Sequence, residues 1–384
     1  MAVRFAAYGR TALFTVLAIV TALLLGALVI IFSDPDALGA WSSFFSDPGE
    51  ALSTSWQVAF DSYEALFDSS FGEFDAINRT LVEATPLLFG GLSVALAFRA
   101  GLFNIGGAGQ VMVGASAAAW AGLTLDLPAV IHLPVALLAG FAGGMLWGGI
   151  AGFLKARTGA HEVITTIMLN FIALRFLDYL LTTDRFQRPG RNDPLSRPMA
   201  ESARLPELPG PVPAHLGLLL ALAATFGVWW LLERSTIGFR MRAVGTNPDA
   251  ARTAGMSVGA TYVLAMALAG GLAGLAGTSN LLGRPSFSLS GGFYESIGFD
   301  AIALALVGRS KPGGVLGAAV LFGALRSGST GMQAATQTPV DIIVVIQALI
   351  ILFVAAPRIV EAIWRVRARE LTDAPQFTSG WGGS

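Results

Sequence analysis

The sequence predicts an all-α protein, a polytopic transmembrane helical bundle, from its composition and the distribution of its charges. Hydrophobic residues make up 54% of the 384 residues and charged residues only 13%, and the mean hydropathy is +0.65. A soluble domain of ordinary composition carries about 25% charged residues. The charges are clustered, which leaves long uncharged runs. Because lipid offers the backbone no hydrogen-bond partner, such runs are expected to cross the bilayer as helices.

About ten runs are long and apolar enough to span a bilayer, since a span needs about 20 such residues. They are expected near residues 12–32, 80–98, 109–125, 133–154, 162–182, 215–232, 260–282, 297–308, 314–332 and 340–356. With the N-terminus inside, fifteen basic residues fall on the cytoplasmic side and seven outside. This asymmetry predicts both termini in the cytoplasm, and residues 1–384 are expected to form a single transmembrane domain.

The composition also excludes several classes of protein. The chain has no cysteine, which excludes disulfide scaffolds and cysteine-ligated metal sites. The formal net charge of −1 gives no reason to expect a nucleic-acid partner. The three histidines and the scattered acids show no metal-ligand spacing, and no phosphate-binding G-x-x-x-x-G-K-[ST] loop is present. We therefore predict no metal site, no cofactor bound by this chain and no enzymatic activity.

Residues 33–78 are expected to form an acidic outer extension, because they contain nine acids and no basic residue. Within them, Asp47 is a good N-cap and Pro48 suits the first helical position. Apolar residues then recur every three or four positions: Leu52, Trp56, Phe60, Tyr63 and Phe67. This spacing predicts an amphipathic helix that lies on the outer surface or packs on the bundle. A docking surface for an external partner is the less favoured alternative.

Two segments place polar residues where a solute pathway could lie. The segment after Arg99 contains Asn104, Gln110 and five glycines, which is typical of a broken helix that lines a cavity. Along the span at 162–182, three polar residues recur at intervals of four and share one helix face. These are Glu162, Thr166 and Asn170. Polar residues at this depth line a pathway or bond neighbouring helices, and for Asn170 both alternatives are equally open, whereas a structural role is favoured for Glu162.

The predicted cytoplasmic loop 233–258 contains a well-specified short helix. Asn247 is a good N-cap, Pro248 suits the first helical position and Asp249 suits the positive end of the helix dipole. Gly255 can end the helix in the left-handed conformation. Two further glycines allow tight turns around this helix: Gly238 and Gly245. The pattern predicts a helix of about seven residues that docks on a partner. The remaining segments outside the spans are an outer loop at 183–214 and a cytoplasmic tail at 357–384.

These segments resemble the permease subunits of ATP-binding-cassette (ABC) importers for simple sugars, nucleosides and branched-chain amino acids. The resemblance rests on ATPLLFGGLSVALAFRAGLFNIGGAGQ, EVITTIMLN, GFRMRAVGTNPDAARTAG and GFDAIALALVGRSKPGGVLGA, and it covers about residues 10–356. It is closest to the nucleoside-importer branch. Where these permeases usually read N-I-G-x-E-G-Q, this chain has Ala108 in place of the glutamate, so it carries no carboxylate at that turn.

The resemblance implies an inverted internal repeat, location in the bacterial inner membrane and three kinds of protein partner. ABC ATPase subunits, which hold ATP and Mg²⁺, would dock on the cytoplasmic helix. A second permease, identical or homologous, would complete the pathway, and an extracytoplasmic substrate-binding lipoprotein would deliver the solute. The expected pathway residues are Phe103, Asn104, Gln110, Asn170 and Asp300. The residues expected to couple to the ATPase are Arg242, Gly245, Asn247, Pro248, Asp249, Ala251, Arg252 and Gly255.

The sequence therefore predicts a permease that moves a nucleoside, with a purine nucleoside favoured, or a similar small polar solute by alternating access. A simple sugar such as ribose and a branched-chain amino acid are the alternatives within this class. An ion-coupled secondary transporter and a non-transporting scaffold are the alternatives from other classes. A secondary transporter would need an acid pair or a cation site in mid-span, whereas Glu83, Asp300 and Asp341 lie near span ends.

Overall fold

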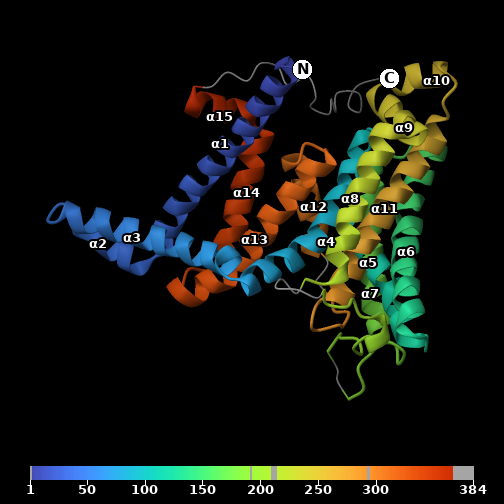
Figure 1. Ribbon diagram of the computed structural model, residues 1–384, viewed down its shortest axis with the longest axis horizontal. Coiled ribbons are helices and arrows are strands. Elements are labelled where there is room, and N and C mark those ends of the chain that lie inside the picture. The colour runs from blue at the N-terminus through green and yellow to red at the C-terminus, as the bar shows by residue number, and fades with distance from the viewer. Residues whose placement is uncertain (1, 191–192, 209–213, 292–294, 366–384) are drawn as a thin grey trace. The chain divides into compact units, whose positions relative to one another are not determined.

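The computed structural model describes residues 2–190, 193–208, 214–291 and 295–365, and most of them are helical (Figure 1). Among these residues, extended backbone pairs only in isolated bridges. The predicted fold class, an all-α polytopic helical bundle, is confirmed. The chain forms two compact units, the first within Met1–Glu83 and Val320–Asp373 and the second within Ala84–Ala319.

All ten predicted spans coincide with helices. These are α1 (Ala2–Ser33), α4 (Phe74–Arg99), α5 (Gly107–Thr124), α6 (Ala129–Thr158), α7 (Glu162–Leu181), α8 (Leu216–Arg234), α11 (Val258–Gly283), α12 (Glu295–Val307), α13 (Pro312–Thr336) and α14 (Asp341–Ala355). In the described part of the chain, six helices are long and apolar enough to cross a membrane, or seven if α14 and α15 (Pro357–Trp364), which are bent by 89°, form one span. The number of ten spans therefore stays a prediction.

The core of the second unit is the close pairing of α6 with α11, and α5 lies against both helices. Four glycines at intervals of four along α6 face α11: Gly140, Gly144, Gly148 and Gly152. A Cβ atom on Gly144 would lie only 2.8 Å from the Cα of Gly274, so the two backbones touch directly. Small residues drive helix association in membranes because they allow this approach. Gly114 of α5 also meets Gly274, so α5 joins this close contact.

The described residues of the predicted outer loop 183–214 pack on the ends of spans. The imidazole of His132 bonds the Ser202 hydroxyl at 2.7 Å and the Ala121 carbonyl at 3.0 Å. The guanidinium of Arg204 lies 4.3 Å from the centre of the Phe287 ring. This arginine therefore has a packing role that is independent of membrane orientation.

In the first unit, α1 packs along α14, and α15 contacts α1. The indole Nε1 of Trp364 donates a hydrogen bond of 2.8 Å to the Thr21 hydroxyl in α1. Residues 357–364, where the predicted cytoplasmic tail begins, therefore form a helix that packs on α1. The apolar and aromatic side chains of this segment contact residues that are distant in sequence, so the local sequence does not indicate this packing. Residues 366–384 of the predicted tail lie outside the described residues.

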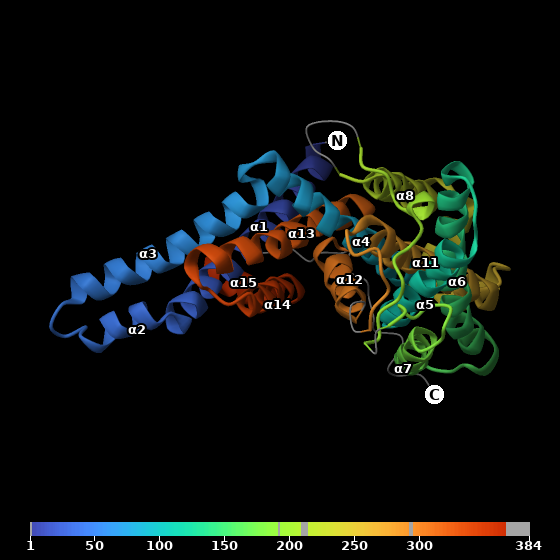
Figure 2. The same cartoon turned by 90° about the horizontal axis from the view of Figure 1, so that it is seen from below.

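Two helices follow α1 as a hairpin, α2 (Pro35–Ser42) and α3 (Pro48–Phe67), which lie side by side (Figure 2). As the sequence predicts, the Asp47 carboxylate caps α3 by accepting a hydrogen bond of 3.0 Å from the Glu50 amide. The buried residues of α3 are Ala51, Ser55, Ala59, Ser62 and Leu66. Of the predicted apolar stripe, Tyr63 packs inward, where its hydroxyl donates a hydrogen bond of 2.6 Å to the Leu23 carbonyl. The other four members are exposed: Leu52, Trp56, Phe60 and Phe67. Small side chains form the packed face, since they let neighbouring helices approach closely.

The glycine contact between α6 and α11 predicts a sharp difference between two glycines of the same helix. In Gly144→Ala the new methyl group would overlap α11, and we expect a loss of about 1–3 kcal/mol of unfolding free energy. In the control Gly149→Ala the nearest atom is the Ala267 Cβ at 3.7 Å, so this methyl is accommodated. Unfolding in mixed micelles followed by circular dichroism measures both variants. Equal stability of the two would contradict the packing described here.

The N-cap of α8 predicts acid lability. His215 is buried, its Nδ1 accepts a hydrogen bond of 3.1 Å from the Gly217 amide, and burial and then the charge of Arg284 lower its pKa to about 4. Because the unfolded state has a pKa near 6.5, it binds more protons between about pH 6.5 and 4, and stability falls as the pH drops through this window by up to about 3 kcal/mol. His215→Asn keeps an acceptor at the cap but does not titrate. We expect its unfolding free energy to depend less steeply on pH, and an identical slope in both proteins would refute the assignment.

Candidate functional site

The candidate site is the break between α4 and α5. α4 ends at Arg99 and α5 begins at Gly107, and residues 100–106, here called the break segment, are not helical. Gly101 turns the chain with a φ of +72°, in the left-handed region that favours glycine. The predicted break is therefore confirmed in place. The amides of residues 100–102 still bond carbonyls in the last turn of α4. Backbone groups beyond them have lost their helical partners, so side chains must satisfy them.

Two amide side chains hold the break segment from within. Asn104 Nδ2 donates to Gln110 Oε1 at 2.9 Å, and Gln110 Nε2 donates to Asn104 Oδ1 at 3.1 Å. Asn104 Oδ1 also accepts from the Gly106 amide at 3.0 Å. Both side chains are almost completely buried. The structure thus brings these two predicted pathway residues together as a reciprocal amide pair.

The polar face of α7 holds the break segment from outside. Asn170 Oδ1 accepts from the Gly109 amide at 2.8 Å, and Asn170 Nδ2 donates to the Ile105 carbonyl at 2.9 Å. One helical turn before Asn170, Thr166 lies against Gly106. Two turns before Asn170, Glu162 Oε1 accepts a hydrogen bond of 3.4 Å from the Phe103 amide. The predicted stripe therefore faces this segment along its length. The bonds of Asn170 are those of a residue that bridges helices, one of its two predicted roles.

The predicted loop 233–258 contains two helices, α9 (Thr236–Thr246) and α10 (Pro248–Thr253). Asn247 Oδ1 accepts from the amides of Asp249 at 3.1 Å and Ala250 at 3.0 Å, as expected of the N-cap. Arg252 bonds Asp249 at 3.0 Å across one turn, and Gly255 follows α10 with a φ of +80°. The expectation that Gly238 and Gly245 form turns was wrong. Both lie within α9, where they allow close contact with neighbouring backbone.

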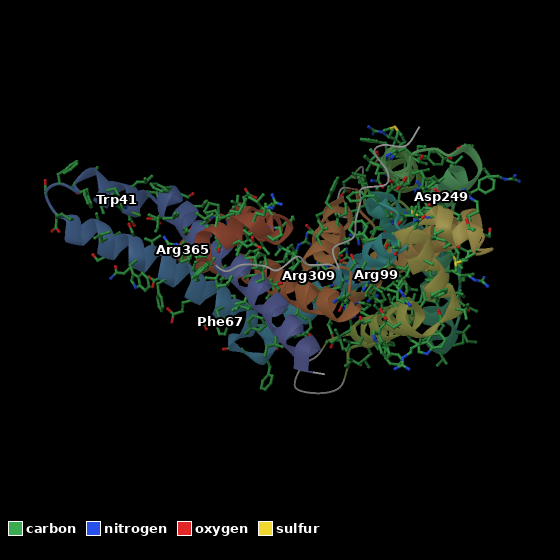
Figure 3. The ribbon with its side chains drawn as sticks, turned by 90° about the horizontal axis from the view of Figure 1, so that it is seen from above. Trp41, Phe67, Arg99, Asp249, Arg309 and Arg365 are labelled. Carbon is green, nitrogen blue, oxygen red and sulfur yellow. The ribbon has the colours of Figure 1, made fainter. Side chains whose placement is uncertain are left out.

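Gly245 joins α9 directly to the break segment. A Cβ atom on Gly245 would lie 2.8 Å from the carbonyl carbon of Ala100, and one on Gly101 would lie 2.9 Å from the Cα of Gly245. The two backbones are therefore in contact, with no side chain between them. Beside this contact, Arg99 Nε donates to the Ser310 carbonyl at 3.1 Å. Arg309, which precedes Ser310, and Arg99 are both labelled in Figure 3.

A second connection runs through side chains. Ala251 of α10 belongs to a buried apolar cluster with Val244 and Val258, against which Tyr262 packs. The Lys155 ammonium lies 5.4 Å from the centre of the Tyr262 ring and forms an ion pair of 2.6 Å with Glu162 Oε2. Since Glu162 also accepts from the Phe103 amide, this chain of contacts links α10 to the break segment.

The other predicted residues lie around these contacts. Phe103 is half-buried and its ring stacks on that of Phe98 at 5.0 Å, while Asp300 is half-buried on α12. Ala108 packs against the backbone of Gly298. The guanidinium of Arg242 has a buried Nη1 with no hydrogen-bond partner in the described part of the chain.

Sequence reasoning missed Asn280. This residue of α11 is 2% exposed, and neither its Oδ1 nor its Nδ2 has a hydrogen-bond partner among the described residues. Its signal was the polar tract of residues 278–280 in an otherwise apolar span. An unpaired buried amide costs free energy, so Asn280 is a candidate for contact with water or solute. Within the described ranges, His, Asp and Glu form no group that could hold a metal ion.

Comparison with known proteins places the chain among transport proteins. The family described as "Branched-chain amino acid transport system / permease component" matches residues 76–355. A guanosine ABC transporter permease protein of Bacillus subtilis is 41% identical over 304 residues, which are 77% of this chain and 85% of the relative. A nucleoside ABC transporter permease protein of Lactococcus lactis is 36% identical, over 78% of this chain and 84% of the relative. A glucose ABC transporter permease protein of Haloferax volcanii is also 36% identical, over 76% and 79% of the two chains. No solved structure is detectably similar.

The reciprocal amide pair predicts strongly coupled mutations. Asn104→Ala or Gln110→Ala alone leaves a buried amide unpaired, and each is expected to cost about 1–3 kcal/mol of unfolding free energy. The double variant removes both groups, so the coupling energy in a double-mutant cycle should be about 1–2 kcal/mol. Unfolding in mixed micelles measures all four proteins. Additive losses would show that the two side chains do not depend on each other.

Proposed function

The chain belongs to the family of branched-chain amino acid transport system permease components, and from this premise we propose that it forms the pathway of an ABC importer for a nucleoside. It is a transport subunit and not an enzyme, and it is a multi-pass protein of the cell membrane. Two relatives are named as guanosine and nucleoside permeases, which supports a nucleoside as the solute. Guanosine is a purine nucleoside, so the first name also supports a purine. The glucose permease supports a sugar as the second candidate.

The observation that carries the mechanism is the double connection between α10 and the break segment. One route runs from α10 into the adjoining α9, whose Gly245 contacts the backbone of Gly101. The other is the path from the Ala251 cluster through Tyr262 and Lys155 to Glu162. A displacement of α10 would therefore reach the break segment at two positions, Gly101 and Phe103. Close-packed contacts transmit such displacements because interiors have few voids.

We assign two roles to the predicted pathway residues. Asn104, Gln110 and Asn170 hold the break segment in shape, because their amide groups are bonded within the chain. We assign contact with the solute to Phe103 and Asp300, which are half-buried, and to the unpaired amide of Asn280. An aromatic ring and a few polar groups suit a nucleoside, whose base stacks and whose sugar forms hydrogen bonds. The break segment would then form the movable part of the pathway wall.

The partners follow from the family. ABC ATPase subunits that bind ATP and Mg²⁺ would dock on α10, whose residues Asp249, Arg252 and Thr253 are exposed. A second permease would complete the pathway, and an extracytoplasmic lipoprotein would deliver the solute. Docking on α10 requires the loop 233–258 to face the cytoplasm, and the basic residues of this loop favour that side. The same orientation of the chain in the bacterial inner membrane places both termini in the cytoplasm.

Uptake into proteoliposomes tests the function. The complex purified with its native partners is reconstituted with its binding lipoprotein, and uptake of labelled guanosine, glucose and leucine is measured with and without ATP. We expect ATP-dependent uptake of guanosine and none in a complex whose ATPase subunits cannot hydrolyse ATP. Uptake of glucose alone or leucine alone would replace the nucleoside with the alternative substrate. Uptake without ATP would overturn the ABC mechanism.

The backbone contact predicts that Gly245→Val uncouples transport from ATP hydrolysis. The new side chain would separate α9 from the break segment, and we expect solute-stimulated hydrolysis to fall by about tenfold while basal hydrolysis persists. Thr246→Val is the matched control, because Thr246 is the next residue and is exposed. Affinity purification checks that both variants assemble. Normal stimulation in an assembled Gly245→Val complex would remove this contact from the mechanism.

A further inference from the structure

α3 has three distinct faces. Its small buried residues pack on the first unit, as described above. Its exposed large apolar residues form a second face, here called the aromatic band: Leu52, Trp56, Phe60 and Phe67, which are 58%, 71%, 52% and 63% exposed. Exposed acids form a third face, here called the acidic stripe: Glu50, Asp61 and Glu64, followed by Asp68 just after the end of α3. At about 100° per residue, the aromatic band lies between the packed face and the acidic stripe.

The aromatic band is therefore a feature of the surface and not of the core. The rings of Trp56 and Phe60 stack at 6.3 Å, so the band presents a continuous apolar surface. The end of the hairpin is also aromatic, with Trp41 stacked on Phe44 at 5.0 Å and Phe45 99% exposed. Figure 3 shows Trp41 and Phe67 near opposite ends of this hairpin. An apolar surface of this length would favour aggregation if it faced water, so it requires an apolar environment.

The neighbouring spans indicate which environment this is. The span of α1 ends at Ser33 and the span of α4 begins at Phe74, so both ends of the extension lie where spans leave the hydrocarbon. In Figures 1 and 2, α3 runs across the direction of α14 and not along it. A helix with this placement lies near the plane of the membrane surface. Trp and Phe favour that depth, where one side of a helix is apolar and the other wet.

We propose that the aromatic band of α3 lies in the interfacial layer of the lipid bilayer, with the acidic stripe turned toward water. The charges select the orientation, because carboxylates are strongly disfavoured in hydrocarbon and are repelled by anionic headgroups. The band therefore inserts by apolar contact alone. In this arrangement α3 supports the packed face of the first unit from the membrane surface and fixes the height of the hairpin relative to the bilayer.

The absence of cysteine from the chain makes a depth measurement direct. Phe60→Cys and Asp61→Cys are adjacent exposed positions, one in the aromatic band and one in the acidic stripe. Each variant, in the assembled transporter, carries a nitroxide in liposomes of phosphatidylethanolamine and phosphatidylglycerol. Power saturation compares collisions with oxygen, which concentrates in lipid, and with a water-soluble nickel chelate. We expect the label at position 60 to favour oxygen several-fold and the label at position 61 to favour nickel.

Two results would overturn the proposal. If both labels favour nickel, the band lies in water. If the label at position 60 is shielded from both reagents, a protein such as the second permease or the lipoprotein covers the band. A second measurement needs no label on the protein. Trp56→Phe removes the fluorescence of one tryptophan, and we expect this part of the fluorescence to be quenched by lipids that carry a nitroxide near the headgroup. Failure of this quenching would also refute the proposal, and neither experiment depends on which solute is transported.

Discussion

The requirement that backbone groups inside a membrane protein be hydrogen-bonded governs this structure. Helices satisfy it by themselves, and the break segment between α4 and α5 cannot. Asn104, Gln110 and Asn170 supply what the missing helical turn would have supplied. Because every one of these bonds is made by a side chain, the segment has a defined shape without being helical. A non-helical segment can shift by exchanging a few side-chain bonds, whereas a continuous helix would have to break its own ladder.

The glycines also determine how this unit packs, and they do so by leaving out side chains. Along α6 and α11, glycine removes side chains so that two helices form one rigid body. At Gly101 and Gly245, glycine instead brings the break segment against α9. The rigid pair and the non-helical segment therefore belong to one unit and depend on the same residue type. This division between a stiff core and a deformable junction is what an alternating-access mechanism requires of a permease.

Local signals predicted much of this arrangement. The helices, the caps at Asp47 and Asn247, the break after Arg99 and the shared face of Glu162, Thr166 and Asn170 all depend on residues close in sequence. Partners distant in sequence could not be predicted. Nothing near Lys155 indicates that it joins Glu162 to Tyr262, and nothing near Gly245 indicates Gly101. The packed side of α3 stayed open for a related reason: in a membrane protein an apolar stripe can face lipid, so hydrophobicity does not identify the packed side.

The two connections between α10 and the break segment differ in what they transmit. The contact of Gly245 with Gly101 joins backbone to backbone, so it resists compression but has no bond to resist separation. The path through Tyr262, Lys155 and Glu162 contains an ion pair and a hydrogen bond to the Phe103 amide, and these resist separation. Under the proposed function, inward movement of α10 would push the segment through the glycines, and outward movement would pull it through Glu162. Alternating access needs both directions, and the two kinds of contact together provide them.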